Sequence, residues 1–116
     1  MLFTVKKENI IEGLQKAAGI IPTRAGAAYL RSLWIKAEGE LTIMATDANI
    51  EFTGTYPADV KEPGLVGVNG RNFVDLVRRL PAGELRIRLD DATGTVILEQ
   101  GRRTYKLPAN DPTWFQ

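Results

Sequence analysis

Segment 68–81 combines an apolar and a polar pattern that together predict an amphipathic helix. Its apolar residues recur at intervals of three and four, the spacing of one buried helical face, and they are Phe73, Leu76, Val77 and Leu80. Asn69 is placed to accept hydrogen bonds from the free N–H groups of the first turn, and Pro81 prevents the helix from continuing. We therefore expect a helix that turns one face to a core.

The opposite face of this predicted helix is mainly basic. Arg71, Asp75 and Arg78 fall within a narrow arc, and Arg79 lies beside them. Because the apolar face is taken by the core, the basic face is free to meet something outside the domain. The function depends on which molecule binds this basic face.

A second helix is predicted earlier in the chain, over residues 8–18. Its apolar residues also cluster on one face, and they are Ile10, Ile11, Leu14, Ala17 and Ala18. Gly13 lies inside this helix, where glycine costs stability relative to alanine, and we expect it to mark a close approach of another part of the chain. The helical residues expected to be buried in the core are Ile10, Ile11, Leu14, Phe73, Leu76 and Val77.

Alternating apolar and polar residues predict eight strands, over 1–6, 28–37, 41–46, 50–56, 64–68, 84–89, 95–99 and 102–107. Asp47, between two of them, is interpreted as a turn residue that bonds its own backbone rather than as a catalytic acid. Residues 57–63 are polar and flanked by prolines, so we expect a crossover linking two halves. The last strand is expected at a sheet edge, where unpaired backbone groups invite another chain.

The order of elements repeats. A strand, a helix and three strands occur twice, and residues of the first strand and helix match those 63 positions later. We therefore predict one α+β domain with an internal pseudo-two-fold repeat, its halves covering about 1–57 and 64–108. In this fold, two helices lie side by side on two four-stranded antiparallel sheets.

The amino-acid composition excludes several classes of function. The chain has 116 residues, 44% apolar and 25% charged, which suits one globular domain. It contains no cysteine and no histidine, so thiol nucleophiles, imidazole bases and the usual zinc ligands are excluded. No phosphate loop, calcium loop or signal segment is visible, and we expect a cytoplasmic, non-catalytic protein without a cofactor or metal. A net charge of +1 argues against tight independent binding of nucleic acid.

Several stretches are similar to one family. They are Met-Leu-Phe-Thr-Val at the start, Ile-Pro-Thr-Arg at 21–24, Ala-Thr-Asp at 45–47, the segment 68–81, and residues 101–108. Together, in this order, the chain resembles the N-terminal domain of the bacterial DNA polymerase III beta subunit, a DNA sliding clamp. The resemblance implies a DNA-clamp fold and a ring of head-to-tail subunits that encircles duplex DNA and tethers the replicative polymerase without catalysing a reaction.

The sequence departs from the family in three places. The family usually has a proline-containing apolar run where this chain has Ala25–Tyr29, a lysine where it has Asn72, and an arginine where it has Thr104. The last two changes affect charged contacts at the ring interface.

The resemblance also assigns site residues. Sequence-independent contacts to DNA phosphates are expected from Arg24, Arg71, Arg78, Arg79, Lys6, Lys7 and Lys16, each of which could equally be an ordinary solvated side chain. The ring interface is expected at Tyr105, Leu107, Arg102 and Arg71, with core packing as the alternative for Leu107. In the family, polymerase and clamp loader bind in two further domains that this sequence lacks, and residues 109–116, with Trp114 and Phe115, would begin the linker to them.

Two other functions remain open. A stand-alone interaction module could recruit a peptide strand at the exposed sheet edge without any DNA. An enzyme could use Asp47 or the pair Asp90 and Asp91, but no base, metal set or phosphate cradle accompanies them.

Overall fold

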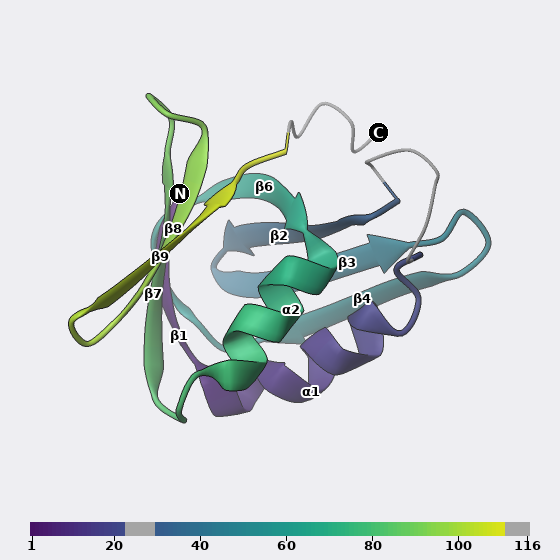
Figure 1. Cartoon of the computed structure of the whole chain (residues 1–116), viewed down its shortest axis with the longest axis horizontal. Coiled ribbons are helices and arrows are strands. Elements are labelled where there is room, and N and C mark those ends of the chain that lie inside the picture. Colours follow the sequence, from purple (N-terminus) through teal and green to yellow (C-terminus); the bar gives the residue numbers. More distant parts are fainter. Residues whose placement is uncertain (23–29, 111–116) are drawn as a thin grey trace.

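Two helices lie side by side across two β-sheets (Figure 1). This computed structural model describes residues 1–22 and 30–110. In chain order, the elements of that part are β1 (Leu2–Lys6), α1 (Lys7–Ala18), β2 (Ser32–Glu38), β3 (Glu40–Thr46), β4 (Glu51–Tyr56), β5 (Asp59–Glu62), β6 (Gly64–Asn69), α2 (Gly70–Arg79), β7 (Glu84–Asp90), β8 (Thr95–Gln100) and β9 (Arg103–Pro108). The predicted α+β class and the antiparallel sheets are confirmed.

One sheet has five strands, in the order β5-β1-β7-β8-β9, and the other has four, in the order β4-β3-β2-β6. The prediction of two four-stranded sheets, with 57–63 as a plain crossover, is wrong in this respect. Residues of β5 pair antiparallel with β1, as Val60 does with Phe3. Only Val60 in this four-residue strand packs against the core, so there was no alternation long enough to reveal it.

The two halves exchange their first strands. β1 pairs with β7 of the second half, and β6 pairs with β2 of the first. The registers agree: Val5 faces Leu85 and Val68 faces Leu33. The first residue of each helix is also hydrogen-bonded to the other half. The backbone N–H of Lys7 donates to the Gly83 carbonyl at 2.9 Å, and that of Gly70 donates to the Arg31 carbonyl at 2.9 Å. This repeated geometry establishes the internal pseudo-two-fold repeat that the sequence predicts.

The core lies between the helices and the sheets. Ile10, Leu14, Phe73 and Val77 are buried there as expected, but Ile11 and Leu76 are only half-buried. The prediction of full burial is therefore wrong for these two residues. Leu76 lines a groove between α2 and β9 instead of facing the core alone, which leaves part of its side chain in contact with water.

Gly13 marks a close approach, as predicted. A Cβ atom at this position would lie 1.7 Å from the hydroxyl oxygen of Tyr56, and one at Gly54 would lie 2.2 Å from the same oxygen. The Tyr56 ring therefore occupies a slot between α1 and β4 that only two glycines leave open. Burial raises the pKa of the Tyr56 hydroxyl above its ordinary value.

The β3–β4 turn confirms that Asp47 is a turn residue. Its carboxylate accepts from the backbone N–H of Ile50 at 2.7 Å and of Asn49 at 2.8 Å. These two hydrogen bonds, in that order, lower the pKa of Asp47 because they favour the charged form. Ala48 at the tip has φ 83°, a left-handed conformation that the hydrogen-bonded turn holds in place.

The strand expected over 28–37 begins later than predicted. Leu30 and Arg31 form a turn, and the strand runs from Ser32 to Glu38. The carbonyl of Arg31 is used by α2 through the Gly70 N–H, so the chain turns here before it enters the sheet. Residues 28 and 29 lie outside the described part.

Candidate functional site

The helical face directed away from the sheets has an excess of positive charge. Its basic residues, from the end of β1 through α1 and α2, are Lys6, Lys7, Lys16, Arg71, Arg78 and Arg79, and its acidic residues are Glu8, Glu12 and Asp75. Six of the seven residues predicted to contact DNA thus lie on the two helices or at the end of β1. The seventh, Arg24, lies outside the described residues.

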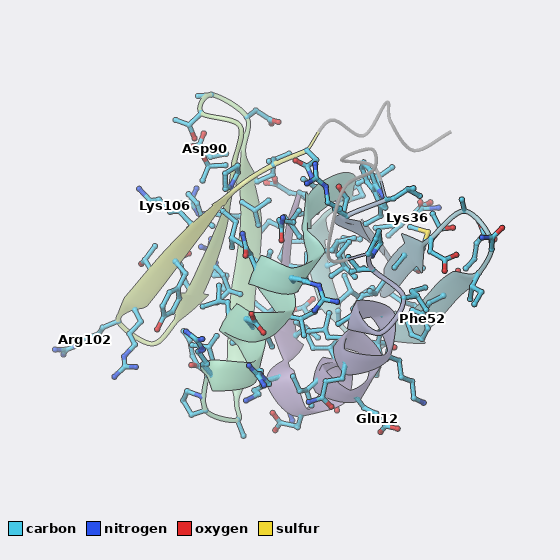
Figure 2. All side chains as sticks on the ribbon, turned by 45° about the vertical axis from the view of Figure 1, so that its right-hand side comes forward. Glu12, Lys36, Phe52, Asp90, Arg102 and Lys106 are labelled. Carbon is cyan, nitrogen blue, oxygen red and sulfur yellow. The ribbon has the colours of Figure 1, made fainter. Side chains whose placement is uncertain are left out.

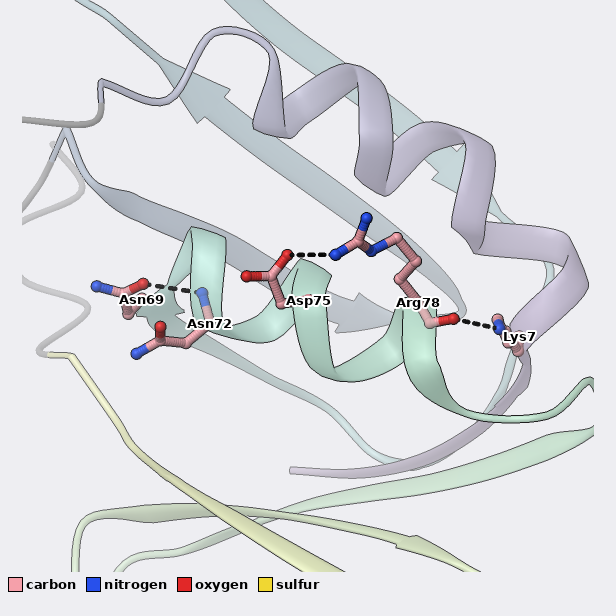
Figure 3. Close-up of polar contacts among 5 residues, drawn as sticks. All are labelled: Lys7, Asn69, Asn72, Asp75 and Arg78. Carbon is pink, nitrogen blue, oxygen red and sulfur yellow. Dashed lines mark hydrogen bonds and ion pairs between the residues drawn. The ribbon is translucent and has the colours of Figure 1, made fainter.

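α2 begins and ends as its sequence predicts. The Asn69 side chain accepts from the backbone N–H of Asn72 at 3.0 Å, which caps the start (Figure 3). The last helical residue is Arg79, two positions before Pro81. The basic residues of the last turn lie near the helix C-terminus, where the macrodipole favours positive charge.

Two of the predicted DNA contacts have a structural role. The Lys7 ammonium donates to the Arg78 carbonyl at 3.0 Å, at the C-terminal end of α2 (Figure 3). It also donates to the Leu80 carbonyl. Arg71, in the first turn of α2, donates to the Ile21 carbonyl just beyond α1 at 3.2 Å. Lys7 therefore satisfies acceptors that the C-terminus of α2 leaves free. Arg71 instead ties the segment that follows α1 to the start of α2.

Two further cations have acidic neighbours on their own helices. Lys16 lies 3.5 Å from Glu12, and Arg78 lies 3.3 Å from Asp75 (Figure 3). These exposed pairs are weak and are easily exchanged for another anion. Lys6 and Arg79 form no ion pair within the described part of the chain. The face offers exposed positive charge with weak ion pairs.

Glu8 joins the helical face to the sheet. Its carboxylate accepts from the backbone N–H of Gly83 at 2.9 Å. Its own backbone N–H and that of Gly83, in this order, lower the pKa of Glu8. Glu8 is therefore held as an anion by the fold, and it moderates the positive charge of the face.

Leu107 is placed in the core, which corrects its assignment to the ring interface. It is 7% exposed and faces Val96 across the sheet, so it offers almost no surface to a partner. Tyr105, two residues earlier, is half-buried and packs against the core with part of its ring exposed. Of the two predicted apolar interface residues, Tyr105 alone presents area.

Arg102 and Arg71 do not flank Tyr105 together. Arg102 lies in the β8–β9 turn, at the tip of the hairpin (Figure 2). This tip lies beside the loop that follows α2, where the Gln100 amide donates to the Pro81 carbonyl at 2.8 Å. Arg71 belongs to the first turn of α2, at its other end. The two arginines therefore lie near opposite ends of α2, and their place in one ring interface stays a prediction.

A groove runs between α2 and β9, with a volume of about 500 Å³. It combines the half-buried Leu76 and Tyr105 with basic side chains, and its lining residues are Asn72, Asp75, Leu76, Arg79, Leu80, Arg103 and Tyr105. Arg79 therefore lines this groove and also belongs to the helical face. Arg103 was missed from the sequence, although its position two residues before Tyr105 on one strand face was the available signal.

Within the described residues, no group of three His, Cys, Asp or Glu side chains could hold a metal ion. The same part of the chain contains no helix of the length and apolar character needed to cross a membrane. The described residues form two candidate binding surfaces: a basic helical face and a groove beside a sheet edge.

Comparisons with known proteins agree with this arrangement. The chain is 31% identical over 113 residues to the beta sliding clamp of Streptomyces coelicolor and 31% identical over 117 residues to that of Escherichia coli K12. The alignments cover 96% of this chain but only 30% and 31% of those proteins. A crystal structure of the DNA polymerase III subunit beta from Pseudomonas aeruginosa superposes with a TM-score of 0.90 at 26% identity, covering 97% of this chain and 31% of that one.

The chain thus spans about a third of the length of these relatives, and it matches them as one domain. A family model for the N-terminal domain of the DNA polymerase III beta subunit matches residues 1–114. Fold, internal repeat and sequence point the same way. The chain belongs to the family of the DNA polymerase III beta subunit, N-terminal domain.

Proposed function

We propose that this chain acts as a domain of a DNA sliding clamp, a non-catalytic ring that encircles duplex DNA in the cytoplasm and tethers a replicative polymerase. The observation that carries the proposal is the helical face, with six basic side chains against three acidic ones. Family membership supports the same function, because curated relatives bear the name beta sliding clamp. In the proposed ring, α1 and α2 face the DNA and the sheets form the outer wall.

The charge distribution suits a contact that moves along DNA. Lys16 and Arg78 already have weak, exposed ion pairs, so phosphates compete with carboxylates and do not meet unsatisfied cations. Lys7 is partly used in capping the end of α2, and Arg71 is partly used in holding the segment after α1. The resulting attraction is weak and independent of sequence, as contacts to the DNA backbone are.

The test is a titration of duplex DNA by fluorescence anisotropy over a series of salt concentrations. We expect a dissociation constant in the nonspecific range, on the order of 10⁻⁴ M at physiological salt, that rises steeply as salt is added. The double variant Arg78→Glu, Arg79→Glu should weaken binding by about tenfold or more.

A matched control removes the same charge elsewhere. Lys36→Glu with Lys61→Glu changes exposed residues of β2 and β5, away from the helical face, and should leave DNA binding within about twofold of the parent. Equal losses in both double variants would show that overall charge alone governs binding. Sequence-selective binding that survives added salt would contradict the proposed function, since it would require contacts to base edges.

The β9 edge is the proposed joint to a neighbouring clamp domain. It carries the partly exposed ring of Tyr105, with Leu76 and Arg79 across the groove, and Arg102 at the hairpin tip. Its outer backbone groups are not paired with any strand of the described chain, so an added strand would extend the sheet. Such a joint closes a ring only with a complementary, different edge on the neighbour.

A further inference from the structure

The outer face of the five-stranded sheet carries cations that the proposed function does not use. Arg88, Ile97 and Lys106 lie in one row across β7, β8 and β9, because the registers place each directly opposite the next. The next row along the strands holds Arg86 opposite Glu99. Figure 2 shows Lys106 directed away from α1 and α2. We call these five residues the outer cluster.

Ile97 is buried although it lies outside the core. It is 5% exposed, yet it does not belong to the buried residues packed between the helices and the sheets. Its direct neighbours on the flanking strands are Arg88 and Lys106, so the methylene stems of two long cations lie over it. Adjacent strands are about 4.8 Å apart, and the charged ends of these two side chains can therefore converge on one anion.

The cations of the outer cluster are only partly satisfied. Glu99 pairs with Arg86 at 2.6 Å, but it lies 3.7 Å from Arg88, which is too long for a hydrogen bond. Lys106 is exposed and has no carboxylate within ion-pair distance among the described residues. One carboxylate thus serves three cations, and Arg88 and Lys106 keep donors available for an anion from outside.

The equivalent face of the four-stranded sheet has a different composition. In the internal repeat β2 corresponds to β7 and β4 to β9, so Arg88 corresponds to Lys36 and Lys106 to Thr55. Lys36 has a carboxylate of its own, since Glu38 lies 3.6 Å away. The concentration of cations therefore belongs to one sheet and is not required by the fold, and the other sheet supplies matched control positions.

The surroundings of the outer cluster favour a protein carboxylate over a nucleic acid. Along β7 the arginines are bounded by Glu84 at one end and Asp90 at the other. Across the strands, the row of the outer cluster ends at Glu62 of β5. A phosphate backbone would have to run past these like charges, whereas it binds best where cations continue along it. A short acidic segment places one or two carboxylates over the cluster without reaching them.

We infer that the outer cluster is a docking site for an acidic segment of a partner protein, whose carboxylates bind Arg88 and Lys106. The inference goes beyond the proposed function and does not depend on it. Because the cluster faces away from α1 and α2, docking there leaves the helical face free. The attraction is electrostatic, so it weakens as salt is added.

The test is an NMR titration of the isotope-labelled chain with hexaglutamate as the probe. We expect saturable shifts at the backbone amides of Ile97 and Lys106 and at the Nε–H of Arg88. The dissociation constant should be on the order of 1 mM and rise with salt, because exposed ion pairs are individually weak. Hexalysine should leave these signals unchanged. Shifts confined to the helical face, or shifts that never saturate, would overturn the inference.

Two pairs of variants separate a site from overall charge. Lys106→Gln should weaken binding at the outer cluster about threefold, the loss expected for one exposed ion pair, whereas Lys36→Gln should leave it unchanged. Glu99→Gln removes the internal competitor and should tighten binding about twofold, whereas Glu38→Gln should not. Equal effects within either pair would show that total charge alone governs binding and would overturn the inference.

Duplex DNA tests the other class of anion. We expect it to shift signals of the helical face and to leave the amides of Ile97 and Lys106 unchanged. Larger shifts of these two amides with DNA than with hexaglutamate would assign the outer cluster to nucleic acid and overturn the inference. A chain that binds hexaglutamate at the outer cluster but does not bind DNA would support the inference and contradict only the proposed function.

Discussion

The grooves at the two sheet edges differ although the repeat places them equivalently. In the first half, Tyr56 lies across Gly13 and lines the groove beside β4. In the second half, the position 63 residues after Gly13 is Leu76, and this side chain stays half-exposed opposite Tyr105. Beside β4 a tyrosine of the strand thus covers the helical position, whereas beside β9 a leucine of the helix occupies it. The difference arises because one helical position holds glycine in the first half and leucine in the second.

The largest effect is expected where the first half is given the residue of the second. Gly13→Leu places a side chain where a Cβ atom alone would meet the Tyr56 hydroxyl at 1.7 Å. We expect a loss of about 3 kcal/mol in the free energy of unfolding, at the upper end of overpacking costs, measured by urea denaturation. Adding Tyr56→Ala should recover part of this loss. A Gly13→Leu chain as stable as the parent would show that the slot is not filled as described.

A smaller effect is expected at Leu76. Leu76→Ala should lower the free energy of unfolding by about 1–2 kcal/mol, because part of the side chain is already in water. Leu14→Ala, at a fully buried leucine of α1, is the reference and should cost about 2–5 kcal/mol. Urea denaturation of both variants measures the two losses in the free energy of unfolding. Equal losses would place Leu76 in the core and remove the difference between the two grooves.

The cap that Lys7 forms on the end of α2 tests whether the halves depend on each other. Lys7→Met removes the donor to the Arg78 and Leu80 carbonyls, and we expect a loss of about 1 kcal/mol. Amide hydrogen exchange should become faster in the last turn of α2. Lys6→Met, which removes the neighbouring charge, should change neither quantity. Unaltered exchange in Lys7→Met would show that Lys7 does not hold the end of α2.

The smallest effect concerns Glu8, which has no acidic counterpart in the second half, because Arg71 stands 63 residues later. The pKa of Glu8 is lowered in the folded domain, so its carboxylate adds stability above the ordinary glutamate pKa of 4.5. That contribution is lost as the pH falls through the lowered value. Thermal melts of the parent and Glu8→Gln should therefore differ at neutral pH and converge in acid. A difference independent of pH would contradict this role.

The sequence was sufficient to predict the helices and most of the strands. The spacing of Phe73, Val77 and Leu80, the Asn69 cap and Pro81 are local signals, and the structure confirms each of them. β5 was missed because a strand with one apolar residue has no period to detect. Leu107 was misplaced because alternation tells which residues share a face, but not how far that face extends from the core.

Long-range contacts were out of reach for the same reason. Lys7 reaches carbonyls more than seventy residues away in sequence, and no local pattern distinguishes it from Lys6. Trp34 is fully buried on a strand face where alternation gave it polar neighbours. The Trp34 ring lies across Gly67 of the adjacent strand, where a Cβ atom would be 2.7 Å from it. Such a match depends on the register of two distant strands.

The exchange of β1 and β6 between the sheets has a consequence for folding. Val5 finds its neighbour Leu85 only when both halves are present, so a long loop must close before the pairing is rewarded, and folding should be slow and cooperative. In either half alone, the three-stranded meander would lack the strand that pairs with it from the other half. The first strand of that half would likewise lack a meander to pair with. Two copies of one half could complete each other's sheets by exchanging their first strands. The domain is, in its connectivity, a domain-swapped pair carried on a single chain.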